Sequence, residues 1–320
     1  MIKPVTGDEV RHVVFDIEDE KAPGLDGYTV AFFKKAWEVV GEEITIAVQQ
    51  FFSSGKLLKQ LNSTLITLVP KVQLPQSMAD FRPISCCTVL YKIISKVMVN
   101  RMKVSLQQLV HFSQNAFIPG RKITENILLA QELLSGYNQS HLPKRCAMKI
   151  DLRKAYDTVA WDFVLAAMIQ FGFHTTFVNW IMECITTPTY SISINGGPQG
   201  FFPATRGLRQ GDPLSPYLFV LVMECLHAMI QFHIHQDGAF AFRWKCENLN
   251  LCMLSFADDI LLFCRAEEHT IILLTYVIQE FADMSGLHAN PSKTQCFLSR
   301  SAAELTEEVL NLTGFQLGHL

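Results

Sequence analysis

The sequence lacks a hydrophobic run long enough to cross a bilayer, and its N-terminus lacks the pattern of a secretory signal. The longest apolar stretch, residues 217–230, is interrupted by Glu224 and His227, whereas a membrane-spanning helix needs about 20 apolar residues. No basic start followed by an apolar core and a small-residue cleavage site opens the chain. We expect an intracellular protein that is neither secreted nor membrane-spanning. No strong basic run marks a nuclear signal, so the sequence does not distinguish nucleus from cytoplasm.

Common metal and nucleotide motifs are also missing. The nine cysteines are scattered and none forms a Cys-x-x-Cys pair, which argues against a zinc site. An odd number of cysteines without a secretory signal indicates free thiols in a reducing compartment. The chain has neither a Gly-x-Gly-x-x-Gly motif nor a Gly-Lys-Ser/Thr loop, which argues against a dinucleotide-binding fold of the dehydrogenase type.

Positive charge is in short supply. Lys and Arg number 27 against 30 Asp and Glu, which gives a net charge of −3 at pH 7, an unusual balance for a chain that holds nucleic acid. The basic residues gather at 82–103, 121–122 and 144–154. This distribution predicts a basic lining inside an acidic outer face. Ordinary solvated helix faces would give the same pattern.

The hydrophobic periodicity predicts few strands among long helices. Helices are expected at 29–40, 42–54, 90–104, 124–137, 161–171, 175–187, 213–233 and 267–284, and residues 75–83 are expected to form a loop. Strands are expected at 65–69, before Asp151, at 190–194 and 200–203 around an Asn-Gly-Gly turn, and at 249–256, 260–264 and 293–298. These elements predict an α+β fold with a mostly antiparallel sheet and helices packed on one face.

Three aspartates stand at the ends of apolar, strand-like runs. Asp151 follows Cys-Ala-Met-Lys-Ile, and Asp258 and Asp259 lie between Leu-Cys-Met-Leu-Ser-Phe-Ala and Ile-Leu-Leu-Phe-Cys. Aspartates in turns are usually only solvated, but carboxylates at the ends of buried strands need a partner. If the three meet, they suit two divalent cations roughly 3.5–4 Å apart, which is the chemistry of nucleotidyl transfer. The alternative is that they merely cap strands or form turns.

Seven blocks occur together in this chain. They are KAPGLDGYTVAFFKKAW (21–37), DFRPISCCTVLYKIISKVMVNRM (80–102), SQNAFIPGRKITENILLAQELL (113–134), KIDLRKAYDTV (149–159), GLRQGDPLSPYLFVLVME (207–224), SFADDILLF (255–263) and GLHANPSKTQ (286–295). In content, order and spacing the set resembles the reverse transcriptases of non-LTR (LINE-type) retrotransposons, especially the plant kind. The resemblance runs from about residue 21 to the last residue.

The resemblance implies the fingers and palm of a right-hand polymerase without its thumb. The implied domains are a lead-in (1–20), fingers (21–145), a palm with some fingers elements (146–299) and a C-terminal edge before the primer-holding hairpin (300–320). The implied activity is that of an RNA-directed DNA polymerase, which extends a DNA primer on an RNA template with dNTPs. Its cofactors would be two Mg²⁺ ions, with Mn²⁺ as the alternative metal.

The resemblance also assigns roles to individual residues. Asp151, Asp258 and Asp259 would bind the metal ions. Lys293 would donate a proton to the leaving pyrophosphate, although an exposed loop lysine is an equally simple interpretation. Tyr156 would stack under the incoming sugar and exclude a 2′-hydroxyl; the alternative is an aromatic packed behind the metal site.

Other residues would bind the nucleotide or the nucleic acid. Arg82 would contact the triphosphate, since its guanidinium pairs with two oxygens. Gln210 and Gly211 would line the nucleotide pocket. Pro213 is expected to open the long helix, with Asp212 as its N-cap rather than as a catalyst. Weaker candidates for nucleic-acid contacts are Arg121, Lys149, Arg153 and Lys154.

The sequence ends before the stretch where this family has its primer-holding hairpin and thumb, and it contains no endonuclease block. We therefore expect a piece of a retrotransposon polyprotein, whose thumb or endonuclease segments would be partners. Three interpretations remain open. The chain is a polymerase core, a folded but inactive remnant that at most binds RNA or RNA–DNA duplex, or another palm-type transferase such as an RNA-copying RNA polymerase. Tyr156 and the Phe-Ala-Asp-Asp sequence argue against the third.

Overall fold

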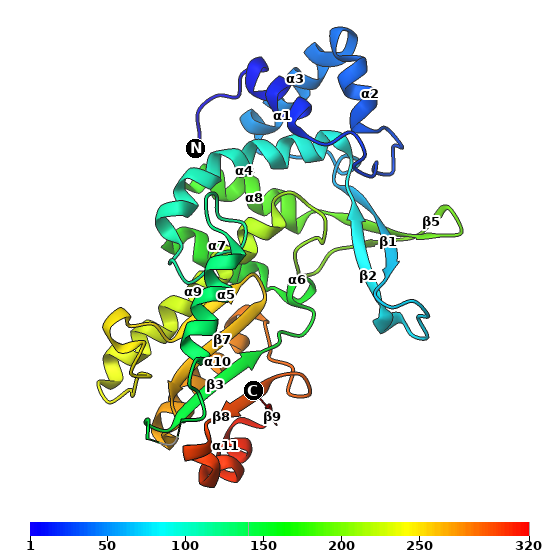
Figure 1. The fold of residues 1–320 in the computed structure, drawn as a ribbon. Helices are drawn as coiled ribbons and strands as arrows, with labels where there is room; N and C mark the ends of the chain where they lie inside the picture. Colours follow the sequence, from blue (N-terminus) through cyan, green and yellow to red (C-terminus); the bar gives the residue numbers. More distant parts are fainter. Residues whose placement is uncertain (140, 320) are drawn as a thin grey trace. The chain divides into compact units, whose positions relative to one another are not determined.

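The computed structural model describes residues 1–139 and 141–319, and the chain divides into two compact units (Figure 1). Unit 1 comprises Met1–Ser105 and Val164–Leu218, and unit 2 comprises Leu106–Phe163 and Phe219–Leu320. Each unit is therefore assembled from two separate stretches of chain. The fingers and palm limits given above stay predictions. Residues 140 and 320, which fall in the predicted fingers and C-terminal edge, lie outside the described residues.

Unit 1 contains a four-stranded sheet in the order β2-β1-β4-β5. Its strands are β1 (Ser63–Pro70), β2 (Phe81–Cys86), β4 (Thr189–Ile194) and β5 (Gly197–Pro203). Strand β1 is antiparallel to β2 and parallel to β4. The β4–β5 hairpin is confirmed, and both Asn195 and Gly196 have positive φ (50° and 81°), as a type I′ turn requires. The prediction of a loop at 75–83 is wrong from Phe81 onward, where β2 begins.

The helices of unit 1 depart from the sequence-based predictions at the N-terminus. Among them are α1 (Gly7–Asp16), α2 (Val30–Lys35), α3 (Trp37–Ser54), α8 (Thr175–Thr186) and most of α4 (Val89–Leu109). The predicted lead-in contains α1, whose first turn is capped by the Thr6 hydroxyl accepting from the Glu9 N–H at 3.2 Å. The predicted helix at 29–40 is interrupted at Ala36, which has ψ 9°.

Unit 2 contains a five-stranded sheet in the order β6-β7-β3-β8-β9. Its strands are β3 (Arg145–Ile150), β6 (Met253–Phe256), β7 (Asp259–Arg265), β8 (Gln295–Leu298) and β9 (Gln316–Leu317). All neighbours are antiparallel except β8 and β9. Strand β3 lies in the centre, with Ile150 opposite Ile260 on one side and Lys149 opposite Gln295 on the other. The mostly antiparallel sheet of the predicted α+β fold is thereby confirmed.

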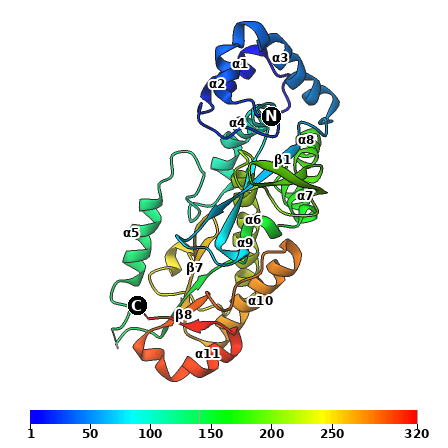
Figure 2. The same cartoon turned by 90° about the vertical axis from the view of Figure 1, so that its right-hand side faces the viewer.

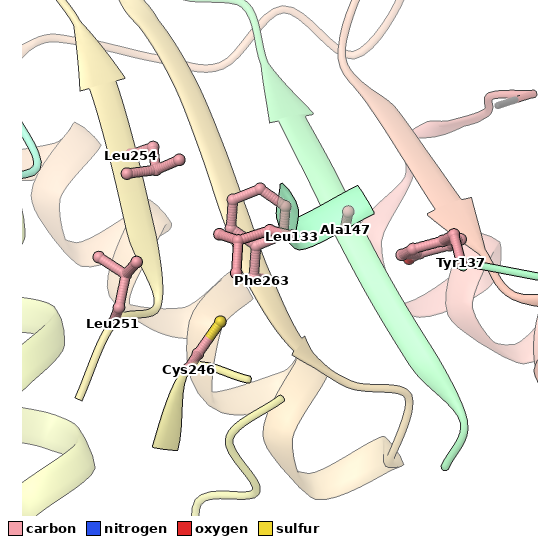
Figure 3. Close-up of a cluster of buried hydrophobic side chains, with 7 residues drawn as sticks. All are labelled: Leu133, Tyr137, Ala147, Cys246, Leu251, Leu254 and Phe263. Atoms are coloured by element: carbon pink, nitrogen blue, oxygen red, sulfur yellow. The ribbon is translucent and has the colours of Figure 1, made fainter. Parts of the chain in front are cut away.

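Side chains alternate across this sheet and build a core on both faces. One face carries Ala147, Leu254 and Phe263, which pack with Leu133 of α5 (Ile123–Leu134) and with Tyr137 (Figure 3). Helix α10 (Glu268–Ser285) lies on the opposite side of the sheet from α5 (Figures 1 and 2). The sequence predicted helices on one face of the sheet. In the structure α5 also covers the other face.

The remaining helices include the longest one. They are α6 (Ala155–Thr158), α7 (Trp161–Gln170), α9 (Ser215–Asp237), α11 (Thr306–Thr313) and three 3₁₀ helices at Met78–Asp80, Glu247–Leu249 and Arg300–Leu305. Helix α9 begins two residues after Pro213, the predicted start. Within the described residues it alone is long and apolar enough to cross a membrane, but 61% of its apolar window is buried. This burial is typical of a core helix.

Candidate active site

The β6–β7 hairpin carries two of the predicted metal ligands. Phe256 pairs with Asp259, so the connection consists only of Ala257 and Asp258. Ala257 has φ +55°, and a positive φ confined to the first central residue defines a type II′ turn, which usually has glycine there. The arms of the hairpin are buried at residues such as Met253 and Ile260, whereas the two aspartates are exposed. The hairpin therefore presents both carboxylates at its tip.

Asp151 reaches the same end of the sheet from β3. It follows Ile150, the last residue of β3, which pairs with Ile260, so Asp151 leaves the strand toward the hairpin tip. Its backbone is held by the turn at 290–294: the Asp151 N–H donates to Thr294 Oγ1 at 3.2 Å, and the Asn290 N–H donates to the Asp151 carbonyl at 2.7 Å.

Lys293 belongs to that turn. Its N–H donates to the Asn290 carbonyl at 3.0 Å, and its side chain is exposed. The turn thus places Lys293 three residues from Asn290, which binds the Asp151 backbone. Both the proton-donor role and the plain exposed lysine are compatible with this placement.

Asp258 is affected by the charges of the other two carboxylates. Although Asp258 reaches the surface, the protein atoms around it displace part of its water; this raises its pKa first, and the negative charges of Asp259 and Asp151 raise it further. A cation at this end of the sheet would relieve that repulsion, and carboxylate oxygens are the ligands that Mg²⁺ prefers. In the part of the chain that the structure describes, however, no three His, Cys, Asp or Glu side chains are gathered closely enough to hold a metal ion as they stand. The donor chemistry fits, and the metal site stays a prediction.

Tyr156 lies near these carboxylates. Its ring stacks on Phe219 of α9 with centroids 4.9 Å apart and planes 17° apart. Burial, and secondarily the charge of Asp258, raise the pKa of the Tyr156 hydroxyl to about 12. The ring therefore has a packing role beside the carboxylate end of unit 2. Contact with a sugar stays a prediction.

Three predicted nucleotide-binding residues come together at β2 of unit 1. Arg82 is exposed on this strand, and the Ser85 N–H donates to the Gln210 carbonyl at 2.7 Å. Gly211 has φ +102°, and a Cβ there would lie 3.2 Å from the Ser85 carbonyl oxygen. Glycine is therefore favoured by the backbone conformation, and a Cβ would also be tight against β2. Its approach to a substrate stays a prediction.

Next to this loop lies a buried polar network that sequence reasoning missed. Arg209 Nη2 and Asp212 Oδ2 are 2.9 Å apart, and both side chains are buried. The Tyr91 hydroxyl donates to Asp212 at 2.6 Å, and the guanidinium lies 4.0 Å from the Tyr91 ring centroid. No sequence signal beyond the i, i+3 spacing of opposite charges points to it.

The prediction of Asp212 as the helix N-cap is wrong, because α9 begins only at Ser215. Asp212 Oδ1 accepts instead from the Leu214 N–H at 2.8 Å, inside the loop before the helix. The side chain is buried because it neutralises Arg209. The ion pair fixes the loop that contains Gln210 and Gly211.

The weaker candidates differ in their surroundings. Lys149, Arg153 and Lys154 are exposed around Asp151, which is compatible with phosphate contacts. The Arg121 guanidinium instead donates to three backbone carbonyls, those of Val110 (2.6 Å), His111 (2.6 Å) and Gln114 (2.7 Å). Arg121 therefore closes the loop before α5. These bonds occupy two of its nitrogens, and a phosphate contact by Arg121 stays a prediction.

Residues 69–317 match the family model described as reverse transcriptase (RNA-dependent DNA polymerase). The chain belongs to this reverse transcriptase family. Its curated relatives include the transposon TX1 uncharacterized 149 kDa protein of Xenopus laevis, 27% identical over 259 residues. This match covers 81% of the chain and 19% of the relative. The Pol polyprotein of the Drosophila melanogaster element R2DM is 27% identical over 276 residues. This match covers 86% of the chain and 24% of that polyprotein.

Membership in this family and these relatives confirm the resemblance to non-LTR retrotransposon reverse transcriptases. The chain spans about a fifth to a quarter of the length of these two relatives. Among solved structures, an apo telomerase from Candida tropicalis superposes with a TM-score of 0.55 at 13% identity, covering 86% of the chain and 57% of that protein. At this identity the likeness concerns the fold alone, and it agrees with the predicted fingers and palm class.

Proposed function

We propose that this chain is the nucleotidyl-transfer core of an RNA-directed DNA polymerase from a non-LTR retrotransposon. Its substrates would be dNTPs, a DNA primer and an RNA template, and its thumb and endonuclease would come from other segments of the parent polyprotein. The observation that supports this best is that Asp151, Asp258 and Asp259 lie at one end of the sheet in unit 2. The negative charges of Asp151 and Asp259 there raise the pKa of Asp258.

In this proposal Asp151 and Asp258 hold the metal ions, with Asp259 as the third carboxylate. When bound, two Mg²⁺ ions, or Mn²⁺ in their place, would favour deprotonation of the primer 3′-hydroxyl and stabilise the leaving pyrophosphate. Lys293 gives a proton to the pyrophosphate, and Tyr156 excludes a 2′-hydroxyl by occupying its space.

Other residues of the proposal bind the nucleotide or the nucleic acid. Arg82 binds the triphosphate through two parallel N–H donors, which a lysine could not supply. Gln210 and Gly211 line the nucleotide pocket, and the buried Arg209–Asp212 pair keeps their loop in place. Lys149, Arg153 and Lys154 steady the nucleic-acid backbone around Asp151.

A second candidate is a folded but inactive remnant that at most binds RNA or RNA–DNA duplex. It is favoured by the net charge of −3, since duplex binding draws much of its free energy from phosphate neutralisation.

Primer extension separates the two candidates. Oligo(dT) annealed to poly(A), with dTTP and either Mg²⁺ or Mn²⁺, is offered to the wild type, to Asp258→Asn/Asp259→Asn and to Asp283→Asn. Asp283 is an exposed aspartate on α10, so its variant controls for loss of negative charge alone. We expect the wild type and the control to extend the primer and the double variant to show only background. Wild-type protein that binds the duplex but does not extend it in either metal would contradict the polymerase proposal and favour the remnant.

A further inference from the structure

A segment from outside the sheet runs beside the hairpin that carries Asp258. Gln114 and Ser255 form a parallel β-bridge. The Ser255 N–H donates to the Ser113 carbonyl at 2.9 Å, and the Asn115 N–H donates to the Ser255 carbonyl at 3.3 Å. Residues 113–115 therefore extend the edge of the sheet beside β6, next to the turn.

The Gln114 side chain continues this contact into the turn itself. Its Oε1 accepts from the Ala257 N–H at 3.2 Å and from the Ala116 N–H at 2.9 Å. Both partners are N–H donors, so the atom that faces them is the amide oxygen. Ala257 is the residue with φ +55°, a conformation that a side chain with a Cβ disfavours. One buried acceptor thus holds the least favourable residue of the turn.

The position of Gln114 is fixed by a second set of amide contacts. Asn126, in the first turns of α5, donates through Nδ2 to the Ser113 carbonyl at 3.1 Å and to the Ser255 carbonyl at 2.8 Å. Asn115 Nδ2 donates to Asn126 Oδ1 at 2.9 Å. The loop and the hairpin edge are therefore tied to the same helix. Gln114 itself is only 2% exposed, so its amide is not free to turn toward solvent.

We propose that Gln114 is a positioning residue that sets the type II′ turn and thereby the direction of the Asp258 and Asp259 carboxylates. The proposal rests on the proposed function, because only that function assigns metal binding to the two aspartates of the turn. Gln114 acts through its oxygen alone, since Nε2 is buried without a hydrogen-bond partner among the described residues. A carboxylate at this position would keep the acceptor.

The full chain with three variants tests this. Gln114→Met keeps the length of the side chain but removes the acceptor, Gln114→Glu keeps the acceptor, and Gln108→Met alters an exposed glutamine of α4 as the matched control. Two readouts are needed: hydrogen exchange at the Ala257 N–H, and Mn²⁺ affinity measured by electron paramagnetic resonance. Thermal unfolding establishes that each variant is folded.

We expect Gln114→Met to speed exchange at Ala257 and to weaken Mn²⁺ binding by about 10- to 100-fold, the usual effect of removing a group that orients metal ligands. Gln114→Glu should restore the slow exchange, and Gln108→Met should match the wild type. If Gln114→Met does not fold, Gln114→Asn replaces it in the same comparison. Its side chain is one methylene shorter, so its amide oxygen no longer reaches the Ala257 N–H.

Folded Gln114→Met protein with wild-type exchange at Ala257 would overturn the proposal, whatever its metal affinity. So would faster exchange with unchanged Mn²⁺ affinity, because the turn would then not direct the carboxylates. A wild type that does not bind Mn²⁺ at all would instead overturn the proposed function. In that case the exchange data still decide whether Gln114 holds the turn.

Discussion

At the scale of single residues, Glu224 on α9 is a buried carboxyl group that the proposed chemistry does not use. Its Oε2 accepts from the His111 N–H at 3.1 Å, and burial raises its pKa to about 7. The His111 ring stacks on His227 with centroids 4.1 Å apart, and burial lowers the pKa of His227 to about 4. The pKa values of Glu224 and His227, both on α9, thus shift in opposite directions for the same reason, because burial disfavours the charged form of each group.

Glu224 predicts a specific pH dependence of stability. Its folded-state pKa is raised, so its contribution is fully present below about pH 4.5 and is lost as the pH rises through about 7. Gln at this position carries no charge at any pH. We expect the stability of Glu224→Gln, relative to the wild type, to improve by roughly 2–3 kcal/mol between pH 4 and pH 8, somewhat less than the ~3.4 kcal/mol that a full shift from 4.5 to about 7 would give.

Urea unfolding at several pH values measures this difference. The opposite contribution of His227 is present in both proteins and largely cancels. Glu268→Gln, at an exposed position of α10, is the matched control for the loss of a surface carboxylate. If the curve for Glu224→Gln runs parallel to that of the wild type, Glu224 is not a buried carboxyl group with a raised pKa.

The residues of the candidate site differed in how far the sequence could predict them. Asp151, Asp258 and Asp259 could be singled out because each stands where an apolar run ends, and a carboxylate there needs a partner. Gln114 could not, because its contact with Ala257 spans 143 positions and its own neighbours look like a polar loop. Asp212 was misread because Pro213 predicts a helix start, whereas α9 begins only at Ser215; its second partner, Tyr91, also lies 121 positions away.

At the scale of elements, two helix ends differ in one physical respect. Helices α10 and α11 both end at a left-handed glycine, Gly286 (φ +78°) and Gly314 (φ +67°). A Cβ on Gly286 would lie 2.4 Å from the Thr158 carbonyl oxygen, whereas a Cβ on Gly314 would meet nothing within 4 Å. Gly286 is therefore needed both for its backbone conformation and for the close approach of Thr158. Gly314 is needed only for its backbone conformation.

This pair predicts unequal effects of the same substitution. Gly314→Ala should lower the free energy of unfolding by about 1 kcal/mol, the cost of a left-handed alanine. Gly286→Ala should lower it by about 3 kcal/mol, because the Thr158 backbone must also move. Chemical denaturation of both variants measures the difference. Equal losses would mean that the end of α10 moves away from Thr158 without resistance.

The sequence predicted the elements unevenly. Helices α8 and α10 and the β4–β5 hairpin were predicted to within a few residues, because their apolar pattern or Asn-Gly turn is local. Strand β2 was missed because Pro83 argues against a strand. It forms an edge of its sheet, in the order β2-β1-β4-β5, where a missing N–H is tolerated. Helix α1 was missed although its buried residues Val10, Val13 and Val14 stand at i, i+3 and i+4, the spacing of a helix face, because the resemblance began only at about residue 21.

At the scale of the whole molecule, the structure assigns many of the basic residues to structural contacts. In the gathering at 82–103, Arg101 pairs with Glu9 at 2.7 Å, Lys96 pairs with Asp16 at 3.1 Å, and Lys92 Nζ donates to the Ala22 carbonyl. Arg121 is bonded to backbone carbonyls. Within unit 2, the exposed residues left from the predicted basic lining are Lys122 and the three around Asp151, which are Lys149, Arg153 and Lys154.

This narrowing predicts how binding responds to salt. Each phosphate contact contributes about 0.7–0.9 to the slope of log K against log salt. We expect Arg153→Gln to reduce the slope for an RNA–DNA duplex by about that amount, and Lys149→Gln/Arg153→Gln/Lys154→Gln to reduce it by roughly 2–3. Fluorescence anisotropy at several salt concentrations measures the slope.

Arg300→Gln is the control. Arg300 is also an exposed cation of unit 2, but it follows the end of β8, which pairs with the start of β3 and so lies at the other end of the sheet from Asp151. It removes the same charge from the molecule, so an effect of net charge alone would lower both slopes equally. A contact at the carboxylate end would lower only the slope of Arg153→Gln. An unchanged slope in the triple variant would place the phosphate contacts elsewhere, and the residues around Asp151 would then be ordinary solvated cations.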